Sequence, residues 1–316
     1  MKKNYKDKIA ITTGDINGIG LEVTVKALNK LDISSDDAVI ITNKDIFNSY
    51  GNQKNDYEII DVGYDLPPEY GKITAKSGHF AFECLKTACL INPKAIVTAP
   101  VSKEAMHLAG HKFNGQTEVL EHFLAHDGQK AEMLFVSEGF NIFLLTRHCA
   151  LKEIELSREL IKEKVMRLND FFKNRLKIKY PKFALCGFNP HSGEGGILGR
   201  EEIEIMTPAV FELNKSGVNI TKPLSADTLF IEAARNYSKK IKAPYDCYVA
   251  VYHDQGLIPI KTIAGESTVN TTIGLDIIRT SPSHGTAFDI AGKNAANSAS
   301  MAEAIKYALK ITERFV

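Results

Sequence analysis

The sequence predicts an α/β protein, and three observations support this class. Short apolar and β-branched runs alternate with longer segments whose apolar residues recur at helical spacing, which is typical of strands joined by crossover helices. At 316 residues, 44% of them hydrophobic, the chain is long enough for two packed lobes. Polar residues also follow several of the expected strands, as they do at the ligand-binding edge of α/β sheets.

Each expected element follows from a local pattern. The strands are short β-branched or apolar runs, expected at residues 8–12, 38–42, 95–98, 133–136, 141–146, 183–188, 247–252 and 269–273. The helices have apolar residues three and four positions apart and are expected at residues 20–31, 77–90, 118–125, 156–176, 200–214 and 300–312. A turn at Glu138 and Gly139 joins two of the strands, and the polar residues 51–57 are expected to form a surface loop.

Composition argues against polyanionic partners and against a membrane location. The chain has 39 basic and 38 acidic side chains, so it lacks the positive charge typical of proteins that bind nucleic acid or anionic membranes. No apolar run is long enough for a signal sequence or a membrane span, which predicts a cytoplasmic protein. The five cysteines are odd in number and lie mostly in apolar runs, which favours reduced thiols.

Three histidines lie just beyond the carboxyl ends of expected strands. His148 follows the strand at 141–146, His191 follows the one at 183–188, and His253 follows the one at 247–252. Because such strand ends share one edge of a sheet, the three imidazoles could converge and bind a divalent cation with positions left open for substrate. The alternative is that they are ordinary surface histidines, which is the interpretation given to His79, His107, His111, His122 and His126.

Two glycine-rich segments are ambiguous. Residues 189–196 could bring the backbone close to a ligand or could simply form a turn before the next helix. Residues 14–20 lie between a strand and a helix, but their glycines are not spaced as G-x-G-x-x-G, and Asn43 stands where a dinucleotide fold has an acidic residue. A Rossmann fold is therefore not predicted.

Lys261, Asn270 and Arg279 recur at intervals of nine residues around the strand at 269–273. A phosphate requires such donors, with arginine as a planar fork and lysine as a point charge. Spacing alone favours three solvated side chains over an anion site.

Six separated blocks, all in order, resemble the 4-hydroxythreonine-4-phosphate dehydrogenase family of pyridoxal phosphate biosynthesis. They are T-A-P-V-S-K at 98–103, N-G-Q-T-E at 114–118, N-P-H-S-G-E-G-G at 189–196, A-D-T-L-F at 226–230, Y-H-D-Q-G-L at 252–257, and I-R-T-S at 278–281 with H-G-T-A at 284–287. The resemblance runs from Gly14 to the end of the chain. Six blocks over one chain are specific where any single block would not be.

The segment H-G-T-A-F-D-I-A-G-K at 284–293, with Ala296 and Asn297 behind it, also resembles the adenine-side loop of isocitrate and isopropylmalate dehydrogenases. This resemblance implies their fold, in which two α/β/α lobes enclose a central cleft. It implies a first lobe of residues 1–120 and 255–316, which contains both termini and the cofactor loop. Residues 121–254 would form a second lobe with the metal ligands and most of a homodimer interface.

The resemblances also imply roles for individual residues. They imply an NAD or NADP cofactor, one divalent ion (Zn, Mg, Mn or Co), and a metal site shared between two subunits. The metal ligands would be His148, His191 and His253; the substrate-binding residues Gln116, Thr117, Lys261, Asn270 and Arg279; and the cofactor-binding residues His284, Gly285, Ala287 and Asn297. Lys103 and Asp254 are candidates for proton transfer or for orienting other groups.

The implied reaction is oxidation of the substrate's secondary alcohol to a β-keto acid, which then loses carbon dioxide. One residue departs from the family pattern: Gln116 stands where the family usually has histidine, and glutamine cannot carry charge. The substrate could therefore be another phosphorylated four-carbon acid, such as phosphothreonate or phosphoerythronate. A three-histidine metallohydrolase and a non-catalytic sensor of sugar-acid phosphates are the alternatives from other classes.

Overall fold

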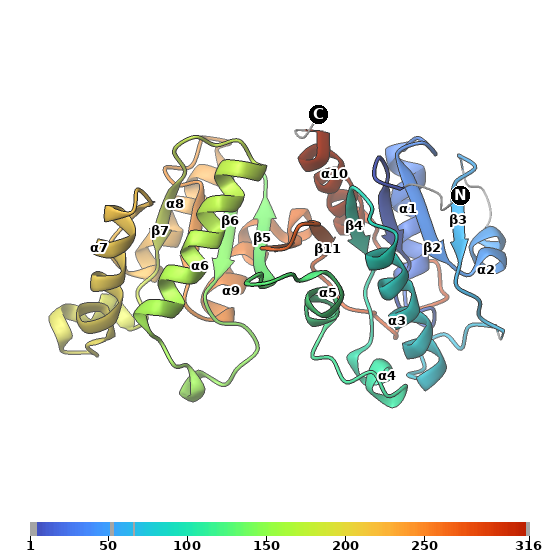
Figure 1. Cartoon of the computed structure of the whole chain (residues 1–316), viewed down its shortest axis with the longest axis horizontal. Coiled ribbons are helices and arrows are strands. Elements are labelled where there is room, and N and C mark those ends of the chain that lie inside the picture. The colour runs from blue at the N-terminus through green and yellow to red at the C-terminus, as the bar shows by residue number, and fades with distance from the viewer. Residues whose placement is uncertain (1–4, 51–53, 66, 314–316) are drawn as a thin grey trace. The chain divides into compact units, whose positions relative to one another are not determined.

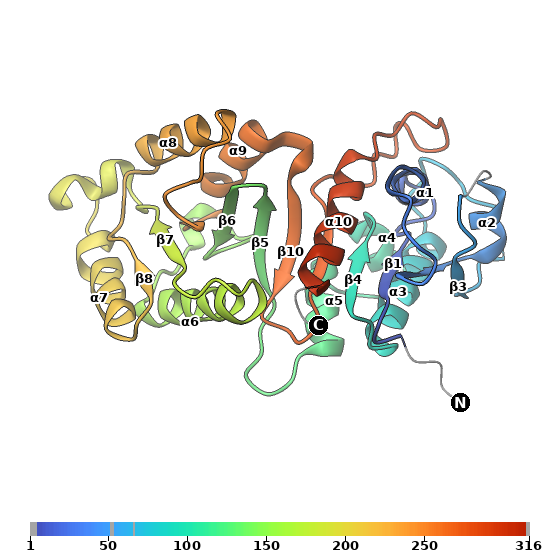
Figure 2. The same ribbon diagram turned by 90° about the horizontal axis from the view of Figure 1, so that it is seen from above.

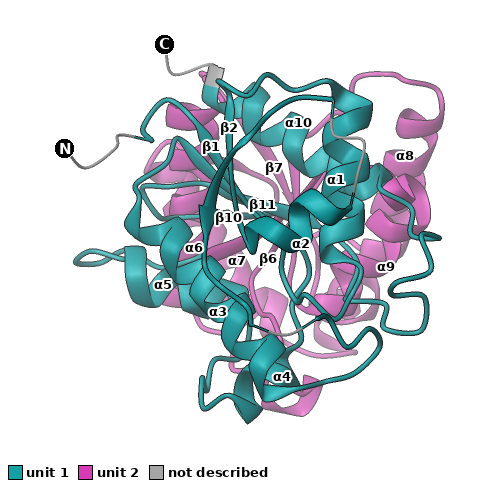
Figure 3. Cartoon of the chain, turned by 90° about the vertical axis from the view of Figure 1, so that its right-hand side faces the viewer, with its two compact units in different colours: residues 1–131, 269–316 teal, residues 132–268 magenta. Residues whose placement is uncertain are grey.

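The structure, a computed structural model, describes residues 5–50, 54–65 and 67–313. The chain divides into two compact units, shown along the chain in Figure 1 and by colour in Figure 3. Unit 1 comprises residues 1–131 and 269–316, and unit 2 comprises residues 132–268. Within the described ranges, the helices lack the combination of length and hydrophobicity that a bilayer crossing requires. Residues 51–53 of the expected surface loop lie outside the described residues.

The sheet of unit 1 has the strand order β3-β2-β1-β4-β11-β10. Its strands are β1 (Ile9–Thr12), β2 (Ala38–Thr42), β3 (Glu58–Asp61), β4 (Ala95–Thr98), β10 (Val269–Ile273) and β11 (Arg279–Pro282). Neighbours pair in parallel, except that β10 and β11 are antiparallel. Because β11 lies between β4 and β10, residues far apart in the sequence become neighbours in this sheet.

Helices cover both faces of the unit 1 sheet, with α3 and α5 on one face and α1 and α10 on the other (Figure 2). The helices of unit 1 are α1 (Gly20–Leu31), α2 (Lys44–Ser49), α3 (Ala75–Leu90), α4 (Lys103–Leu108), α5 (Gln116–Leu124) and α10 (Ala299–Glu313). Polar caps begin several of them: the side chains of Asn43, Thr74 and Ser102 each accept a hydrogen bond from a backbone N–H of the first turn. Under α3, Phe80 and Cys84 belong to one buried apolar cluster with Ile96 of β4.

The sheet of unit 2 has the strand order β5-β6-β9-β7-β8. Its strands are β5 (Glu132–Ser137), β6 (Phe140–Leu144), β7 (Lys182–Leu185), β8 (Asn219–Ile220) and β9 (Cys247–Ala250). The pair β5 and β6 is an antiparallel hairpin, and the other neighbours are parallel. The parallel part places the residues after β6, β7 and β9 at one edge.

Helices α6 and α7 cover one face of this sheet, and α8 and α9 cover the other (Figure 2). They are α6 (Arg158–Asp170), α7 (Thr207–Lys215), α8 (Ala226–Ser238) and α9 (His253–Ala264). Single π-helical turns, Phe171–Arg175 and Glu202–Met206, extend α6 and precede α7. Leu229 of α8 and Leu257 of α9 join one buried cluster with Tyr248 of β9.

The expected strands and helices are present, with most ends shifted by a few residues. The expected strand at 183–188 ends at Leu185, and the one at 247–252 ends at Ala250. Sequence patterns did not indicate several other elements: β3, β8, β11, α2, α4, α8 and α9. The α/β class is confirmed.

The two units meet in the sequence at 131/132 and 268/269, whereas the expected lobe boundaries were 120/121 and 254/255. The second difference places all of α9, including Lys261, in unit 2. Packing explains this, because a Cβ added to Gly256 of α9 would lie only 2.7 Å from Ile142 Cγ2 of β6. Such a close approach joins α9 to the unit 2 sheet.

Candidate active site

Arg279 is the most deeply buried charged residue among the expected substrate-binding residues. It begins β11, is only 3% exposed, and donates from Nε to Thr98 Oγ1 of β4 at 2.8 Å. Burial lowers the pKa of its guanidinium to about 9, because the charged form loses hydration, while the charge of Glu118 acts in the opposite direction. Among the described residues, no carboxylate forms a salt bridge with Arg279. A bound anion would compensate this buried charge.

Gln116 and Thr117 begin α5 near the same strand. Gln116 Nε2 donates to the Ala99 carbonyl, just after β4, at 3.2 Å, and Thr117 is buried. Gln116 Oε1 is buried without a hydrogen-bond partner among the described residues. Lys103 lies close by, since a Cβ at Gly115 would be 3.7 Å from its Cε. This part of unit 1 therefore combines the positive charges of Arg279 and Lys103 with an acceptor, Gln116 Oε1, that has no partner among the described residues.

Asn270 lies on the same face of the sheet as Arg279. The antiparallel register pairs Asn270 with Ser281 and Thr272 with Arg279, so the four residues share one face. Within the described chain, Asn270 Oδ1 and Thr272 Oγ1 are buried without partners. Unused buried polar atoms beside a buried cation indicate a site for a polar, anionic ligand.

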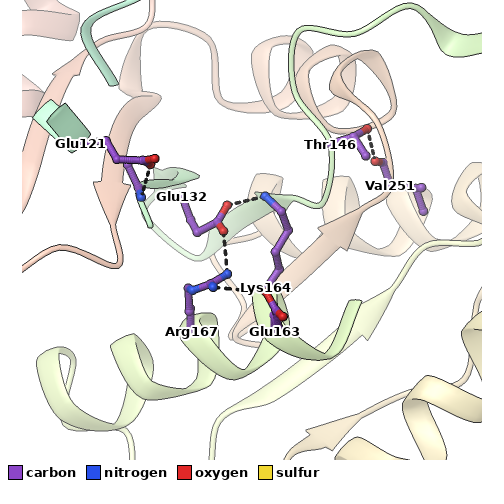
Figure 4. Close-up of polar contacts among 8 residues, drawn as sticks. Glu121, Glu132, Thr146, Glu163, Lys164, Arg167 and Val251 are labelled. Carbon is purple, nitrogen blue, oxygen red and sulfur yellow. Dashed lines mark hydrogen bonds and ion pairs between the residues drawn. The ribbon is translucent and has the colours of Figure 1, made fainter. Parts of the chain in front are cut away.

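In unit 2, the structure brings His148 and His253 together. Their ring centroids are 5.6 Å apart. Thr146 donates from both its backbone N–H and its Oγ1 to the Val251 carbonyl, at 3.0 and 2.7 Å, which ties the segment before His148 to the segment before His253 (Figure 4). His253 Nδ1 lies 2.7 Å from Asp254 Oδ1. A proton on Nδ1, held by this carboxylate, leaves Nε2 free to bind a metal ion.

His191 lies in an unusual turn of unit 2. Five successive residues from His191 to Gly195 have positive φ angles, between 44° and 76°. Glu202 anchors the turn by accepting a 2.7 Å hydrogen bond from the Asn189 backbone N–H. The electrostatic influence of His191 reaches Asp227, although hydrogen bonds, first of all from Ser225, are the main cause of the lowered pKa of Asp227. In the described residues, no three His, Cys, Asp or Glu side chains form a metal-binding group.

The remaining expected residues of unit 2 are exposed. Asp254 is exposed, and its carboxylate contacts His253 Nδ1 and so orients the His253 ring. Lys261 is exposed in the last turn of α9. Asp254 is therefore in a position to orient His253, and Lys261 carries an exposed positive charge.

The residues expected to bind the cofactor lie in a segment of unit 1 with little regular structure. His284 Nδ1 contacts the Gly285 carbonyl at 2.9 Å, and its Nε2 is buried without a partner in the described chain. Ala287 has a positive φ of 42°, and Asn297 Oδ1 accepts from the Ala299 N–H at the start of α10. The Ile19 N–H donates to the Thr286 carbonyl at 3.0 Å, so the segment rests on the amino end of α1.

A buried charge cluster in unit 2 was not indicated by the sequence. Glu132, at the start of β5, accepts from Lys164 and, at 3.1 Å, from Arg167, both of which lie on α6 (Figure 4). Burial lowers the pKa of Lys164, and the charge of Glu132 partly offsets this. No local pattern could have predicted the cluster, because its members come from elements about 32 residues apart.

Comparisons with known proteins define first the class and then the family. A β-decarboxylating dehydrogenase from Thermococcus kodakarensis has a similar fold, with a TM-score of 0.51 and 15% identity over 96% of this chain and 83% of that one. The fold is thus that of isocitrate and isopropylmalate dehydrogenases rather than a Rossmann fold, which confirms the prediction. A family model described as "Pyridoxal phosphate biosynthetic protein PdxA" matches residues 11–308, and the chain belongs to this family.

Named relatives agree with the family. The chain is 36% identical to 4-hydroxythreonine-4-phosphate dehydrogenase of Sulfurihydrogenibium sp., over 96% of this chain and 97% of that protein. It is also 36% identical to D-threonate 4-phosphate dehydrogenase of Salmonella typhimurium, over 96% and 98%. The crystal structure of 4-hydroxythreonine-4-phosphate dehydrogenase from Klebsiella pneumoniae has a TM-score of 0.82 and 33% identity, over 97% of this chain and 100% of that one. These relatives are dehydrogenases, and the chain is accordingly an oxidoreductase.

Proposed function

We propose that the chain is an NAD(P)-dependent and divalent-metal-dependent 4-hydroxythreonine-4-phosphate dehydrogenase. It would oxidise 4-hydroxy-L-threonine 4-phosphate to 2-amino-3-oxo-4-phosphooxybutanoate, which decarboxylates to 3-amino-2-oxopropyl phosphate in pyridoxine 5'-phosphate biosynthesis. Family membership supports the reaction class. The observation that carries the substrate class is the buried guanidinium of Arg279.

Arg279 favours a doubly charged ligand with hydrogen-bonding groups. A guanidinium that has lost its hydration, and that uses one N–H on Thr98, gains most from an anion that accepts two parallel hydrogen bonds. Phosphates and carboxylates have this geometry. The unused oxygens of Gln116 and Asn270 would accept hydrogen bonds from the hydroxyl or ammonium groups of the same ligand. Lys103 would add positive charge for its second anionic group.

The residues of unit 2 fit a divalent cation in part. His148 and His253 are adjacent, and Asp254 holds the His253 ring with Nε2 available, which suits a metal ligand. When bound, a divalent cation supplies Lewis acidity that makes the substrate's secondary hydroxyl easier to deprotonate. A second copy of the chain would complete the ligand set of this site.

A homodimer is therefore part of the proposal. Helices α8 and α9 form an apolar groove of about 520 Å³, whose lining includes Asp227 and Asp254. Ile231 and Ile258 stand exposed along it, at 56% and 63%. A second copy that covers these side chains would bring its own residues close to Asp254 and hence to the neighbouring His253.

One observation supports the binding of a nicotinamide cofactor by the segment 284–297. His284 Nε2 is a buried nitrogen without a partner in the described residues, and a hydrogen-bond donor of a ligand would satisfy it. Residues of this segment would hold the nicotinamide cofactor, which would supply the hydride acceptor for the oxidation. NAD and NADP are both compatible with these residues.

Gln116 supports one alternative substrate. Its amide is neutral, so it can orient a hydroxyl as readily as an ammonium group. A relative named D-threonate 4-phosphate dehydrogenase is as similar to the chain as one named 4-hydroxythreonine-4-phosphate dehydrogenase. Oxidation of 4-phospho-threonate or 4-phospho-erythronate is therefore the second candidate.

The test is cofactor reduction by the purified protein with added divalent metal, comparing 4-hydroxythreonine 4-phosphate, 4-phospho-threonate and 4-phospho-erythronate at equal concentrations. We expect the highest kcat/KM with the first substrate and no reduction in the presence of a chelator. Arg279→Lys should raise KM for each phosphorylated substrate, because lysine lacks the planar fork. Higher kcat/KM with an acid that lacks the amino group would favour the alternative. Absence of reduction with all three would refute both.

A further inference from the structure

Glu22, in the first turn of α1, is a buried carboxylate that the reaction does not use. It is 1% exposed, and its Oε1 accepts from the backbone N–H of Ala296 at 2.7 Å and from Lys26 Nζ at 2.7 Å. Lys26 Nζ also donates to the carbonyls of Asn294 and Ala296, at 2.9 and 3.1 Å. One ion pair on α1 thus holds three backbone groups of the segment that follows residue 293.

These contacts bridge the longest sequence separations among the hydrogen bonds of unit 1 described here, 268 to 274 residues. They fix the carboxyl end of the segment 284–297. The other end is fixed to the start of the same helix, where the Ile19 N–H donates to the Thr286 carbonyl. Helix α1 therefore holds the segment at two points.

The segment needs such support because it has few internal constraints. Between β11 and α10 it contains turns and irregular backbone, with positive φ angles at Ala287, Gly292 and Asn294. Two local hydrogen bonds, from the N–H groups of Ile290 and Lys293 to carbonyls three residues earlier, are its main internal backbone contacts. A loop with so few contacts samples many conformations unless other elements hold it.

The environment of Glu22 indicates that the ion pair between Glu22 and Lys26 does more than stabilise the fold. The phenols of Tyr50 and Tyr70 lie near enough for the Glu22 charge to contribute to their raised pKa values, although burial is the larger cause. Within the described chain, Glu22 Oε2 is buried without a hydrogen bond. An ion pair between a buried carboxylate and a lysine side chain that is 32% exposed contributes little to stability compared with apolar packing.

We propose that Glu22 and Lys26 are positioning residues that hold the segment 284–297 in the conformation that binds the cofactor. This inference rests on the proposed function, which assigns the nicotinamide cofactor to that segment. The pair acts through the backbone of residues 294–296 and does not itself contact the cofactor. Its loss should weaken cofactor binding and leave the anion-binding residues around Arg279 unaffected.

The experiment compares the wild-type protein with Lys26→Met and Glu22→Gln. Methionine keeps the aliphatic stem of Lys26 but removes both hydrogen bonds that Lys26 donates to the segment, whereas glutamine keeps the Oε1 acceptor for the Ala296 N–H. Lys86→Met is the matched control, because Lys86 pairs with Glu83 on α3 and has a similar exposure. The readouts are hydrogen exchange of the amides of residues 284–297 without ligand, and the calorimetric Kd for NAD, NADP and inorganic phosphate.

We expect Lys26→Met to raise the cofactor Kd about tenfold, the effect of losing a charged hydrogen bond, and to speed exchange across 284–297. Glu22→Gln should have a smaller effect, and Lys86→Met none. The phosphate Kd should not change in any variant. If the wild-type and Lys26→Met proteins bind the cofactor with the same Kd, the inference is overturned whatever the exchange rates, but the proposed function is not. A wild-type protein that binds neither NAD nor NADP would overturn the proposed function together with the inference.

Discussion

Burial changes the acid–base chemistry of Arg279 and Asp15 in opposite directions for the same physical reason. Each ionised side chain loses hydration in the interior of unit 1, so the pKa of the guanidinium falls to about 9 and the pKa of the carboxyl rises to about 6. Arg279 lies beside unused acceptors, which suits a ligand site. Asp15 is surrounded by donors of its own chain, the Asn17 N–H and the Ser77 hydroxyl, which suits a structural role.

Thr98 should determine how the planar guanidinium of Arg279 is oriented toward a ligand. Thr98→Val keeps the branched shape but removes the acceptor for Arg279 Nε, so we expect KM for the phosphorylated substrate to rise about tenfold with a smaller change in kcat. Thr98→Ser should restore KM, because it keeps the hydroxyl. Thr271→Val is the control, since Thr271 is equally buried in the same unit and its hydroxyl has no partner in the described residues. A Thr98→Val enzyme with unchanged KM would contradict this role.

Asp15 should make the folded protein less stable at neutral pH than at mildly acid pH. Its folded pKa of about 6 lies above the unfolded value of about 3.9, so the folded state binds the proton more tightly. Its contribution is most favourable below about pH 4 and is lost as pH rises through about 6, to a total of about 3 kcal/mol.

Asp15→Asn removes this titration and keeps an oxygen that accepts from the Asn17 N–H. Its Nδ2 can donate to the Ser77 hydroxyl, which still has the Thr74 carbonyl as an acceptor. The free energy of unfolding of the variant, measured in urea from pH 4 to 8, should exceed that of the wild type by an amount that grows with pH. The exposed Asp36→Asn serves as a control for loss of one carboxylate. A constant difference between Asp15→Asn and wild type across this range would show that Asp15 does not titrate in it.

The sequence supplies candidate residues for the site, but the hydrogen-bond partners of those residues could not be predicted from it. Motif resemblance singled out Arg279, Gln116 and the histidines without any coordinates. The bond between Thr98 and Arg279 joins residues 181 positions apart, and the bond between Glu22 and Ala296 joins residues 274 apart. Such contacts depend on the strand order, which local periodicity does not encode.

At the level of elements, hydrophobic patterning predicts the strands and helices that bury apolar side chains. It misses those that bury polar side chains. Strand β11 consists of Arg279, Thr280, Ser281 and Pro282, all buried, yet it contains no aliphatic run. The hydroxyl of Thr280 is satisfied inside the protein because it donates a hydrogen bond to the Ala304 carbonyl of α10. Helix α9 contains Gly256 and Pro259, which ordinarily argue against a helix. Tertiary packing decides both cases.

The contact between α3 and α4 provides a test of close helix packing. A Cβ added to Gly78 would lie 2.0 Å from the Ala105 carbonyl oxygen and 2.5 Å from the Met106 nitrogen, both backbone atoms of α4. Alanine is the better helix former by about 1 kcal/mol, but the clash opposes it. We therefore expect Gly78→Ala to lower the free energy of unfolding by about 1–3 kcal/mol.

Gly285→Ala is the control for this substitution, because nothing lies within 4 Å of its added Cβ. Its effect on stability, measured by urea denaturation, should be within about 0.5 kcal/mol. If Gly78→Ala were neutral or stabilising, α4 would not be held where the structure places it.

At the scale of the whole molecule, the proposed homodimer can be tested through the groove between α8 and α9. Ile258→Lys places a charge among exposed apolar side chains that a second copy would cover, so we expect the dimer Kd to rise at least about a hundredfold in sedimentation experiments. Leu90→Lys, on α3, is the matched control at a similarly exposed apolar residue. A monomeric wild type, or a dimer unaffected by Ile258→Lys, would contradict the proposal.

The discontinuity of unit 1 was expected from the resemblance, but its boundaries were not. The expected junction at 254/255 followed the last metal-ligand motif, whereas the structural junction at 268/269 follows the helix that packs on the unit 2 sheet. Sequence motifs indicate where functional residues lie, whereas the boundary of a compact unit depends on which helices and strands pack together. The close approach of the Gly256 backbone to Ile142 and Leu144 of β6, which sets this limit, cannot be read from the motif itself.

The position of β11 also has a consequence for the order of events during protein synthesis. Strand β4 lacks its β11 neighbour until about 180 further residues have been made, an interval of about 10–40 s at about 5–20 residues per second. We expect residues 1–131 of ribosome-stalled chains to resist protease only when the stall lies beyond α10; equal resistance with a stall at residue 268 would contradict this. Until then the nascent chain carries an open strand edge, which is a site for chaperone capture and for aggregation.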